Sequence, residues 1–326
     1  MNFQPSPEQR ALQQGIRSFC EARLTVDELR RLEGRGVDRA LWKELAEMGV
    51  FALRRPEEQG GLGLAAADAV LVFEELGRKV VPGPLLWTQL AADLVDGAAV
   101  GEVVVGGLDL CGASPVPYMI EHYESLDVLL VLRPDGVETL DPGDVTVQPV
   151  NDPLDPLTPL HYAAQLPAGK RIGSEAEASK LRLEGMALVA SLCLGIAEAT
   201  LDMANAYAKQ REQFNRPIGS FQAIKHMLAD MFVQQEVARA AAYAAGATLD
   251  HPEVANVEQT VRGAKLVTAE AALENARACI QIHGGMGYTW EVPAHYYLKR
   301  AWVLDTVFGA SDEHAERIAE ILSTPV

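Results

Sequence analysis

Two short segments in the last third of the chain combine a fixed cation, side-chain amides and paired glycines. The first is QREQFNRPIGSFQAIKH (210–226) and the second is QIHGGMGYTWEVP (281–293). Arg211 offers a planar, permanently charged fork that suits a diphosphate. Gly284 and Gly285 let backbone N–H groups approach such a group without an intervening Cβ. Together the two segments are typical of a site for a phosphate-containing cofactor.

Each of these residues also has a purely structural interpretation. The glycines 284 and 285 could end a helix, where glycine supplies a positive φ. Gln222 could be a solvated residue of a first helical turn, and Phe214 could anchor a core. Arg211 could be an exposed cation that the dipole of a helix end favours. The joint occurrence of both segments favours the cofactor interpretation.

The overall charge excludes one class of partner. The 326 residues carry 28 Lys and Arg against 45 Asp and Glu, a formal net charge of −17. Nucleic-acid affinity depends largely on neutralising phosphates, so this balance argues against a polyanion-binding surface. A single arginine can still bind a diphosphate locally. The length and apolar content are sufficient for two or three domains with a real core.

Cysteines and histidines give no sign of a metal site, and we expect no metal. The four cysteines lie far apart and form no CxxC pattern, and nothing suggests an oxidising compartment. No two histidines have metal-ligand spacing with a carboxylate on the same face. The N-terminal MNFQPSPEQR has no apolar run suitable for a signal peptide, and we expect no bilayer-spanning stretch. A cytoplasmic location is therefore expected.

The elements that must position these segments fall into three blocks. We expect an N-terminal helical domain over residues 1–99, because apolar residues recur there at helical spacing. A middle β domain is expected over 100–180, where short β-branched runs alternate with Pro-Asp-Gly and Asp-Pro-Gly turns typical of antiparallel strands. Three prolines in NDPLDPLTPL (151–160) predict a loop.

The last block, 181–326, is predicted to be a C-terminal four-helix-type bundle, because long helices joined by short loops pack antiparallel. Ser220 is the expected N-cap of its second helix. The predicted helices of the whole chain cover residues 6–33, 38–49, 65–78, 84–97, 182–211, 220–249, 253–282, 292–307 and 311–322. The expected fold class is α+β, multidomain, in the order helical, β, helical.

With these motifs in this order, the chain resembles the acyl-CoA dehydrogenase family. The first block carries LWKELAEMGVFALRRPEEQGGLGL (41–64) and FEELGR (73–78). The last block carries an Arg-x-x-Phe stretch followed by a Pro, a Gly and a Gln, and a Gln-x-x-Gly-Gly-x-Gly-Tyr segment. These positions are Arg211, Phe214, Pro217, Gly219 and Gln222, and Gln281, Gly284, Gly285, Gly287 and Tyr288. The resemblance covers about 1–95 and 181–326.

The resemblance implies FAD as the cofactor and α,β-desaturation of an acyl-CoA thioester as the reaction. In this family FAD lies across a subunit interface, with its flavin ring in one subunit and its adenosine diphosphate end against the neighbour. Arg211 would bind the diphosphate, while Phe214 would offer an apolar face. The expected cofactor-binding residues are Arg211, Gln213, Phe214, Gln222, Gln281, Gly284 and Gly285.

The family's catalytic glutamate is missing from its usual place. That glutamate, in a Tyr-Glu-Gly-Thr stretch, removes an α-proton while a hydride leaves the β-carbon for the flavin. Phe308 stands there in this chain, and phenylalanine cannot act as a general base. Some members place the glutamate before the long helix that leads to Arg211, and the family's spacing then gives Gly185. Its neighbour Glu184 is a weak candidate, since a one-residue offset rotates a helical side chain by about 100°. We therefore assign no catalytic residue.

The family's flavin-ring motifs are also missing from the middle block. Members that hold the ring usually show a Thr-Glu-Pro…Gly-Ser-Asp loop and a later Gly-x-Lys-x-(Trp/Phe)-Ile-(Thr/Ser) strand. The nearest segments here, 112–118 and 167–172, carry neither pattern, and the domain looks short. The chain thus keeps the residues for the adenosine end of FAD but lacks the flavin-ring motifs and the base. In this it resembles one subunit of the two-gene, α2β2 acyl-CoA dehydrogenases of actinobacterial steroid side-chain degradation.

Three hypotheses remain at the level of sequence. The favoured one is a subunit without the base, inactive alone, that pairs with a second, different acyl-CoA dehydrogenase subunit and contacts the adenosine end of FAD. The second is a self-sufficient homo-oligomeric dehydrogenase that uses Glu184. The third is a non-catalytic scaffold, which the retention of Arg211 and of the 281–288 segment disfavours.

Overall fold

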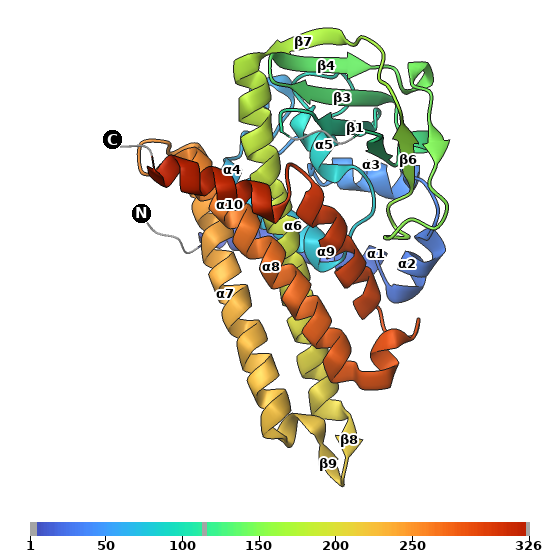
Figure 1. Cartoon of the computed structure of the whole chain (residues 1–326), viewed down its shortest axis with the longest axis vertical. Helices are drawn as coiled ribbons and strands as arrows, with labels where there is room; N and C mark the ends of the chain where they lie inside the picture. Colours follow the sequence, from blue (N-terminus) through green and yellow to red (C-terminus); the bar gives the residue numbers. More distant parts are fainter. Residues whose placement is uncertain (1–4, 113–115, 324–326) are drawn as a thin grey trace.

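The computed structural model describes residues 5–112 and 116–323, and it confirms the predicted fold class (Figure 1). The N-terminal helices are α1 (Pro7–Arg23), α2 (Val26–Leu32), α3 (Arg39–Glu47), α4 (Ala66–Arg78) and α5 (Leu85–Leu90). The C-terminal helices are α6 (Glu175–Gln210), α7 (Gln222–Asp250), α8 (Val257–His283), α9 (Ala294–Thr306) and α10 (Ser311–Ser323). The β block lies between them in the sequence and at one end of the long helices (Figure 1).

Several helix boundaries differ from the prediction. The helix expected over 84–97 is α5, which already ends at Leu90, and the residues that follow it form turns. The first predicted helix is in fact two, because Thr25 adopts an extended backbone and caps α2 by accepting a hydrogen bond from the backbone N–H of Glu28. Helix α6 begins at Glu175, not at residue 182, since Ser174 and Glu177 form a capping box there. The residue before α7 is Phe221, and the predicted cap Ser220 belongs to the short 3-10 turn Ile218–Ser220.

The β block contains two small sheets. The first has the strand order β1-β3-β4-β7, and the second has the order β2-β6-β5. The strands are β1 (Val105–Asp109), β2 (Tyr118–Glu121), β3 (Val128–Arg133), β4 (Gly136–Leu140), β5 (Gln148–Pro149), β6 (Leu160–Ala163) and β7 (Lys170–Ser174). The expectation of antiparallel strands throughout is wrong for one pair, since β1 and β3 are parallel. Parallel neighbours need a long crossover connection, and the segment between β1 and β3 is long enough because it includes β2 of the other sheet.

Helix α6 forms the centre of the bundle. By length and mean hydropathy, 1.6 over its most apolar window, it could cross a membrane, which the sequence analysis did not expect. In the fold, however, 78% of that window is buried inside the protein. It packs against α4, α7 and α8, and Gly77 and Gly195 allow α4 and α6 to approach backbone to backbone. A helix apolar on most sides is here the core of the bundle.

A buried network of carboxylates and arginines joins α1, α4, α6 and α7. Glu74 and Glu198 are 2% and 3% exposed. Arg78 Nη1 donates to Glu198 Oε2 over 2.8 Å, and Arg239 pairs with the other oxygen of Glu198. Tyr243 donates its hydroxyl to Glu74 Oε2 over 2.8 Å. Burial and the charge of Glu198 hold the pKa of Glu74 well above its usual range, so Glu74 is the protonated member of the pair.

The three blocks meet at Arg300 of α9. Its Nε pairs with Asp155 of the middle block, and its Nη1 donates to the carbonyl of Val81, which follows α4, over 3.2 Å. Asp155 is 1% exposed and also accepts hydrogen bonds from the backbone N–H of Leu157 and the hydroxyl of Thr158. A buried ion pair resists separation, because either partner alone would remain buried and charged.

We predict that Glu74→Gln flattens part of the pH dependence of stability. The raised folded-state pKa of Glu74 means that its contribution is fully present below the ordinary value of 4.5 and is lost as pH rises through the raised value. Glutamine is uncharged at every pH, so the gain of the variant over wild type should grow between about pH 5 and about pH 8. Denaturant unfolding at both pH values measures this, with the exposed Glu58→Gln as control. Parallel pH curves for Glu74→Gln and wild type would contradict it.

Candidate functional site

The first cofactor-type segment forms a hairpin that extends beyond the end of α6. Strands β8 (Glu212–Gln213) and β9 (Arg216–Pro217) pair antiparallel, and the backbone N–H of Ile218 donates to the carbonyl of Arg211 over 2.8 Å. The two tip residues, Phe214 and Asn215, have φ of +55° and +63°. Left-handed backbone is tolerable for Asn and costly for Phe. The tip therefore presents an aromatic ring that is 88% exposed.

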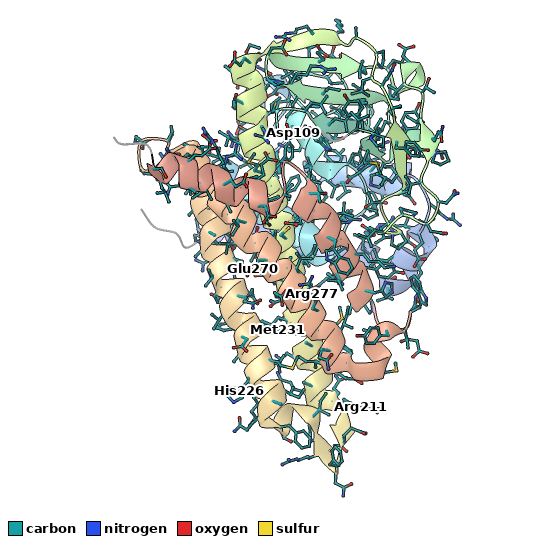
Figure 2. All side chains as sticks on the ribbon, viewed as in Figure 1. Asp109, Arg211, His226, Met231, Glu270 and Arg277 are labelled. Carbon is teal, nitrogen blue, oxygen red and sulfur yellow. The ribbon has the colours of Figure 1, made fainter. Side chains whose placement is uncertain are left out.

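The second segment ends α8 at the same end of the bundle. Gly284 has φ of +59° and ends the helix, and residues Gly284–Tyr288 continue as a 3-10 turn. The ring of His283 stacks on Tyr207 of α6, with centroids 4.2 Å apart. A small apolar cluster around Leu201, Met231 and Ile280 joins α6, α7 and α8 there. Figure 2 shows Arg211 at this end and Asp109 near the β block at the other.

All seven predicted cofactor-binding residues are exposed at this end of the bundle. They are Arg211, Gln213 and Phe214 on the hairpin, Gln222 at the start of α7, and Gln281, Gly284 and Gly285 at the end of α8. Within the described part of the chain, the guanidinium of Arg211 has no hydrogen-bond or ion-pair partner, whereas Arg216 lies over the ring of Phe221 at 4.0 Å. Arg211 is therefore available to an anion from outside.

The glycines of this segment have different roles. A Cβ on Gly287 would lie 2.4 Å from the carbonyl oxygen of Ile280, so Gly287 is needed for packing within the chain. A Cβ on Gly285 would meet nothing within 4 Å, and its φ is not positive. Neither sterics nor backbone conformation of this chain requires a glycine at 285. The open backbone there fits close approach by a second molecule.

Two exposed aromatic residues of this end were not predicted as site residues. Tyr288 is 81% exposed and Trp290 is 56% exposed. Arg30 of α2 donates to the carbonyl of Trp290, and Lys299 lies 5.1 Å from the centre of its ring. The signal in the sequence was the pair of aromatic residues directly after the glycines, but nothing in it showed that both would face solvent.

The two possible positions of a catalytic base meet in the interior. A Cβ on Gly185 of α6 would lie 2.3 Å from Cζ of Phe308, so the ring occupies the space beside Gly185. Phe308 is 2% exposed, and its ring lies 4.9 Å from the ring of Trp87 on α5, centre to centre. Aromatic side chains therefore fill the space at the two positions for which the family resemblance predicts a carboxylate.

The turn that carries Phe308 is strained and held on both sides. Phe308 has φ of +60°, an uncommon conformation for a bulky residue that persists only when its surroundings impose it. Lys265 of α8, which is fully buried, donates to the carbonyl of Asp305 over 2.9 Å and to that of Gly309 over 3.4 Å. Nε2 of His314 lies 3.1 Å from the same Gly309 carbonyl oxygen. These contacts fix Phe308 in place.

Glu184 takes part in a different group of charges. Its Oε1 lies 3.4 Å from Nη2 of Arg54, and Nη1 of Arg54 lies 3.6 Å from Oδ1 of Asp250. Asp250 accepts hydrogen bonds from the backbone N–H groups of Ala66 and Ala67 at the start of α4. Burial raises the pKa of Glu184, and the charge of Arg54 acts in the opposite direction. The carboxylate thus ties α6 to the loop before α4.

Charged residues close the edge of the β block that faces α6. Arg182 of α6 donates through Nε to Asp109 at the end of β1 over 2.7 Å, and through Nη2 to Glu313 of α10 over 3.1 Å. A Cβ on Gly112 would approach both Arg182 and Glu313. Of the two segments compared with flavin-ring motifs, 112–118 includes residues 113–115, which lie outside the described residues, and 167–172 leads into β7.

Comparison with known proteins identifies relatives for both helical blocks. The model of the acyl-CoA dehydrogenase N-terminal domain matches residues 6–96, and that of the C-terminal domain matches 163–323. The acyl-CoA dehydrogenase IpdE2 of Mycobacterium tuberculosis is 37% identical over 286 residues, which are 82% of this chain and 81% of that protein. These matches confirm the family resemblance inferred from the motifs.

Two solved structures share the whole fold. A chain of the ChsE4-ChsE5 complex from Mycobacterium tuberculosis superimposes with a TM-score of 0.84 at 24% identity, covering 100% of both chains. A chain of a variant of the Tcur3481-Tcur3483 steroid ACAD superimposes with a TM-score of 0.83 at 22% identity, covering 97% of this chain and 98% of the other. At these identities the similarity shows the fold alone.

We predict that Gly185→Ala destabilises the protein and that Phe308→Ala relieves much of this effect. The new methyl group would overlap the ring of Phe308, whereas the double variant leaves it space. The control is Gly263→Ala on α8, where a Cβ meets nothing within 4 Å and should stabilise by up to about 1 kcal/mol. Denaturant unfolding of the wild type, the two single variants and the double variant gives the coupling free energy between the two positions. Strictly additive effects of the two substitutions on the free energy of unfolding would contradict the contact.

Proposed function

The chain belongs to the acyl-CoA dehydrogenase family, and we propose that it is the subunit of a two-component, FAD-dependent dehydrogenase that lacks the catalytic base. FAD is the cofactor of this family. When bound, it would supply the acceptor for the hydride that leaves the β-carbon of the acyl thioester. The partner subunit supplies the glutamate and the pocket for the flavin ring. This chain supplies contacts to the adenosine diphosphate end of FAD and the surface on which the partner assembles.

The contact between Phe308 and Gly185 is the observation that carries the proposal. Phe308 stands where the family's usual glutamate stands, and Gly185 stands at the alternative position. The two are in contact, so one aromatic ring fills the space that either carboxylate would use. Hydrogen bonds to the backbone carbonyls of Asp305 and Gly309 hold the turn that carries the ring, and a phenyl ring cannot take a proton. In this interpretation the chain's own acyl site is closed as well as inert.

The opposite end of the bundle fits the adenosine diphosphate of a neighbour's FAD. Arg211 provides a free, permanently charged fork for the diphosphate. Gly284 and Gly285 leave their backbone open toward solvent, so their N–H groups can approach phosphate oxygens. Gln213, Gln222 and Gln281 bring amide groups to the same end, and the exposed ring of Phe214 provides a face for stacking.

The outer face of α7 supports assembly with a partner. Phe232, Val233 and Val237 are 54%, 59% and 53% exposed on this one helix. Large apolar side chains gathered on one exposed face are a marker of a protein interface. The face continues from Gln222, so a partner that covers it would bring its own FAD toward the hairpin. We infer an α2β2 assembly, in keeping with the paired proteins of the ChsE4-ChsE5 complex.

The substrate we infer is a CoA thioester with a bulky acyl group, and a steroid side chain is the specific candidate. The Tcur3481-Tcur3483 protein, which shares the fold, is a steroid ACAD. We infer a role in lipid metabolism and a cytoplasmic location, which accords with a soluble acyl-CoA substrate. The acyl pocket itself would lie largely in the partner.

A second candidate function is a self-sufficient homo-oligomeric dehydrogenase with Glu184 as its base. The raised pKa of Glu184 favours it, since catalytic bases are often buried carboxyls. The pairing of Glu184 with Arg54 counts against it, because the carboxylate is already engaged in a structural group of charges. A scaffold without cofactor is disfavoured by the open Gly285 and the unpaired Arg211.

We predict that Arg211→Ala lowers the FAD content of the co-purified two-subunit complex without separating the subunits. Gly285→Ala should do the same, although its methyl group meets no atom of this chain. The loss of a charge-assisted contact corresponds to roughly a tenfold or greater weakening of FAD binding. Flavin absorbance per complex after gel filtration is the measurement.

Two substitutions serve as controls for this prediction. Arg35→Ala removes an exposed arginine far from the hairpin, and Gly263→Ala adds a methyl group to an open face of α8. Both should retain full flavin content. Full flavin content in Arg211→Ala and Gly285→Ala as well would remove the basis for placing FAD at this end.

We also predict that Glu184→Gln leaves turnover by the complex within about twofold of wild type, since its carboxylate has no chemical role. The expected effect is on stability alone, through the contact with Arg54. Acyl-CoA oxidation with an artificial electron acceptor measures turnover, and flavin content checks that the site is intact. Loss of turnover with full flavin content would contradict the prediction and show that Glu184 takes part in the reaction, as the self-sufficient alternative requires.

A further inference from the structure

A small polar cavity lies where the three blocks meet, apart from the exposed end of the bundle. The turn between α4 and α5, the end of β2, Thr158, α6 and α9 line it, and its volume is about 30 Å³. Apolar side chains form most of its wall. Glu121, His122, Thr158 and Arg300 form its polar part.

Two of these side chains bring polar atoms that have no hydrogen-bond partner among the described residues. One is Nη2 of Arg300, whose Nε and Nη1 are used by Asp155 and by the carbonyl of Val81. The other is Nδ1 of His122. Arg300 is 9% exposed and His122 is 3% exposed. A buried polar atom without a partner costs about 1–3 kcal/mol, and more when the group is charged.

The charges around the cavity balance without an ion. Asp155 already neutralises Arg300. Burial and the positive charge of Arg300 lower the pKa of His122 to about 3, so His122 is neutral at pH 7. Burial raises the pKa of Glu121. A neutral imidazole has one nitrogen that donates and one that accepts. The occupant must therefore be small and uncharged, and must both donate and accept hydrogen bonds.

The backbone around the cavity is held in uncommon conformations. His122 has φ of +54°, and its backbone N–H donates to the carbonyl of Pro159 over 2.7 Å. Val80, which also lines the cavity, has φ of +43°, an outlier for a β-branched residue. Such conformations persist only where the surroundings fix them. The polar end of the cavity is therefore preformed.

We propose that this cavity is a structural water site, in which about two ordered water molecules bridge Nη2 of Arg300 and Nδ1 of His122. One buried water requires about 10–15 Å³, so the volume accommodates about two. The waters complete the hydrogen bonding of Arg300, which joins α9 to both other blocks. Because Val307 lines the same cavity, the water molecules also fill the space next to the turn that carries Phe308. The proposal does not depend on the function proposed above.

A crystal structure of the full chain, alone or in its complex, tests the site directly, before and after pressurisation with xenon. A dry apolar cavity takes up xenon, whereas a hydrated polar one does not. We expect water density within hydrogen-bonding distance of Nη2 of Arg300 and of Nδ1 of His122, and no xenon peak. A xenon peak, or the absence of such water density, would overturn the proposal.

A filling substitution gives a second test in solution. Val303→Ile adds one methyl group toward the cavity from α9. If water fills the cavity, the methyl group displaces it and leaves polar atoms unpaired, so the Tm should fall by about 2 °C or more. If the cavity is dry, filling it raises the Tm. Val233→Ile, at an exposed position of α7, is the control and should leave the Tm unchanged. An unchanged or raised Tm for Val303→Ile contradicts the proposal.

Discussion

The buried pair of Arg300 and Asp155 is the constraint on which the arrangement of the three blocks depends. Arg300 belongs to α9, Asp155 belongs to the loop that prolines keep free of regular structure, and the carbonyl of Val81 follows α4. Removing one partner of such a pair costs about 3–5 kcal/mol, because the other remains buried and charged. Helix α9 begins shortly after the exposed glycine segment and ends at Thr306, two residues before Phe308. The contacts of Arg300 therefore anchor the helix that connects these two regions.

In the function proposed above, the chain separates two parts of a cofactor site that a self-sufficient enzyme must combine. Its exposed end keeps a free arginine, open glycine backbone and a stacking ring, all directed outward. Its interior is closed by aromatic rings and by the pairing of Arg182 with Asp109 and Glu313. An outward-facing half-site is useful only to a neighbouring molecule, and a closed interior cannot compete with that neighbour for substrate. The two features are therefore consistent with a complex in which this chain contacts part of the FAD and the partner binds the substrate.

Much of the fold and of the candidate site could be predicted from the sequence, and there are physical reasons why the other features could not. The order of the blocks, the helical segments and the family followed from periodicity and motifs, because these depend on neighbours along the chain. The parallel pairing of β1 with β3, and the contact between Phe308 and Gly185, depend on residues distant in sequence. The break at Thr25 was missed because apolar spacing continues through it, although its hydroxyl caps α2. The exposure of Trp290 was equally invisible, since its anchor Arg30 belongs to another block.

The central claim is that this chain holds half of a shared FAD site, and flavin content measured together with native mass tests it most directly. The chain would be purified alone and co-expressed with a family member that carries the flavin-ring motifs and the glutamate. The account predicts no FAD on the chain alone, and one FAD per pair of unlike chains in a four-chain complex. One FAD per chain in an assembly of identical chains would contradict it.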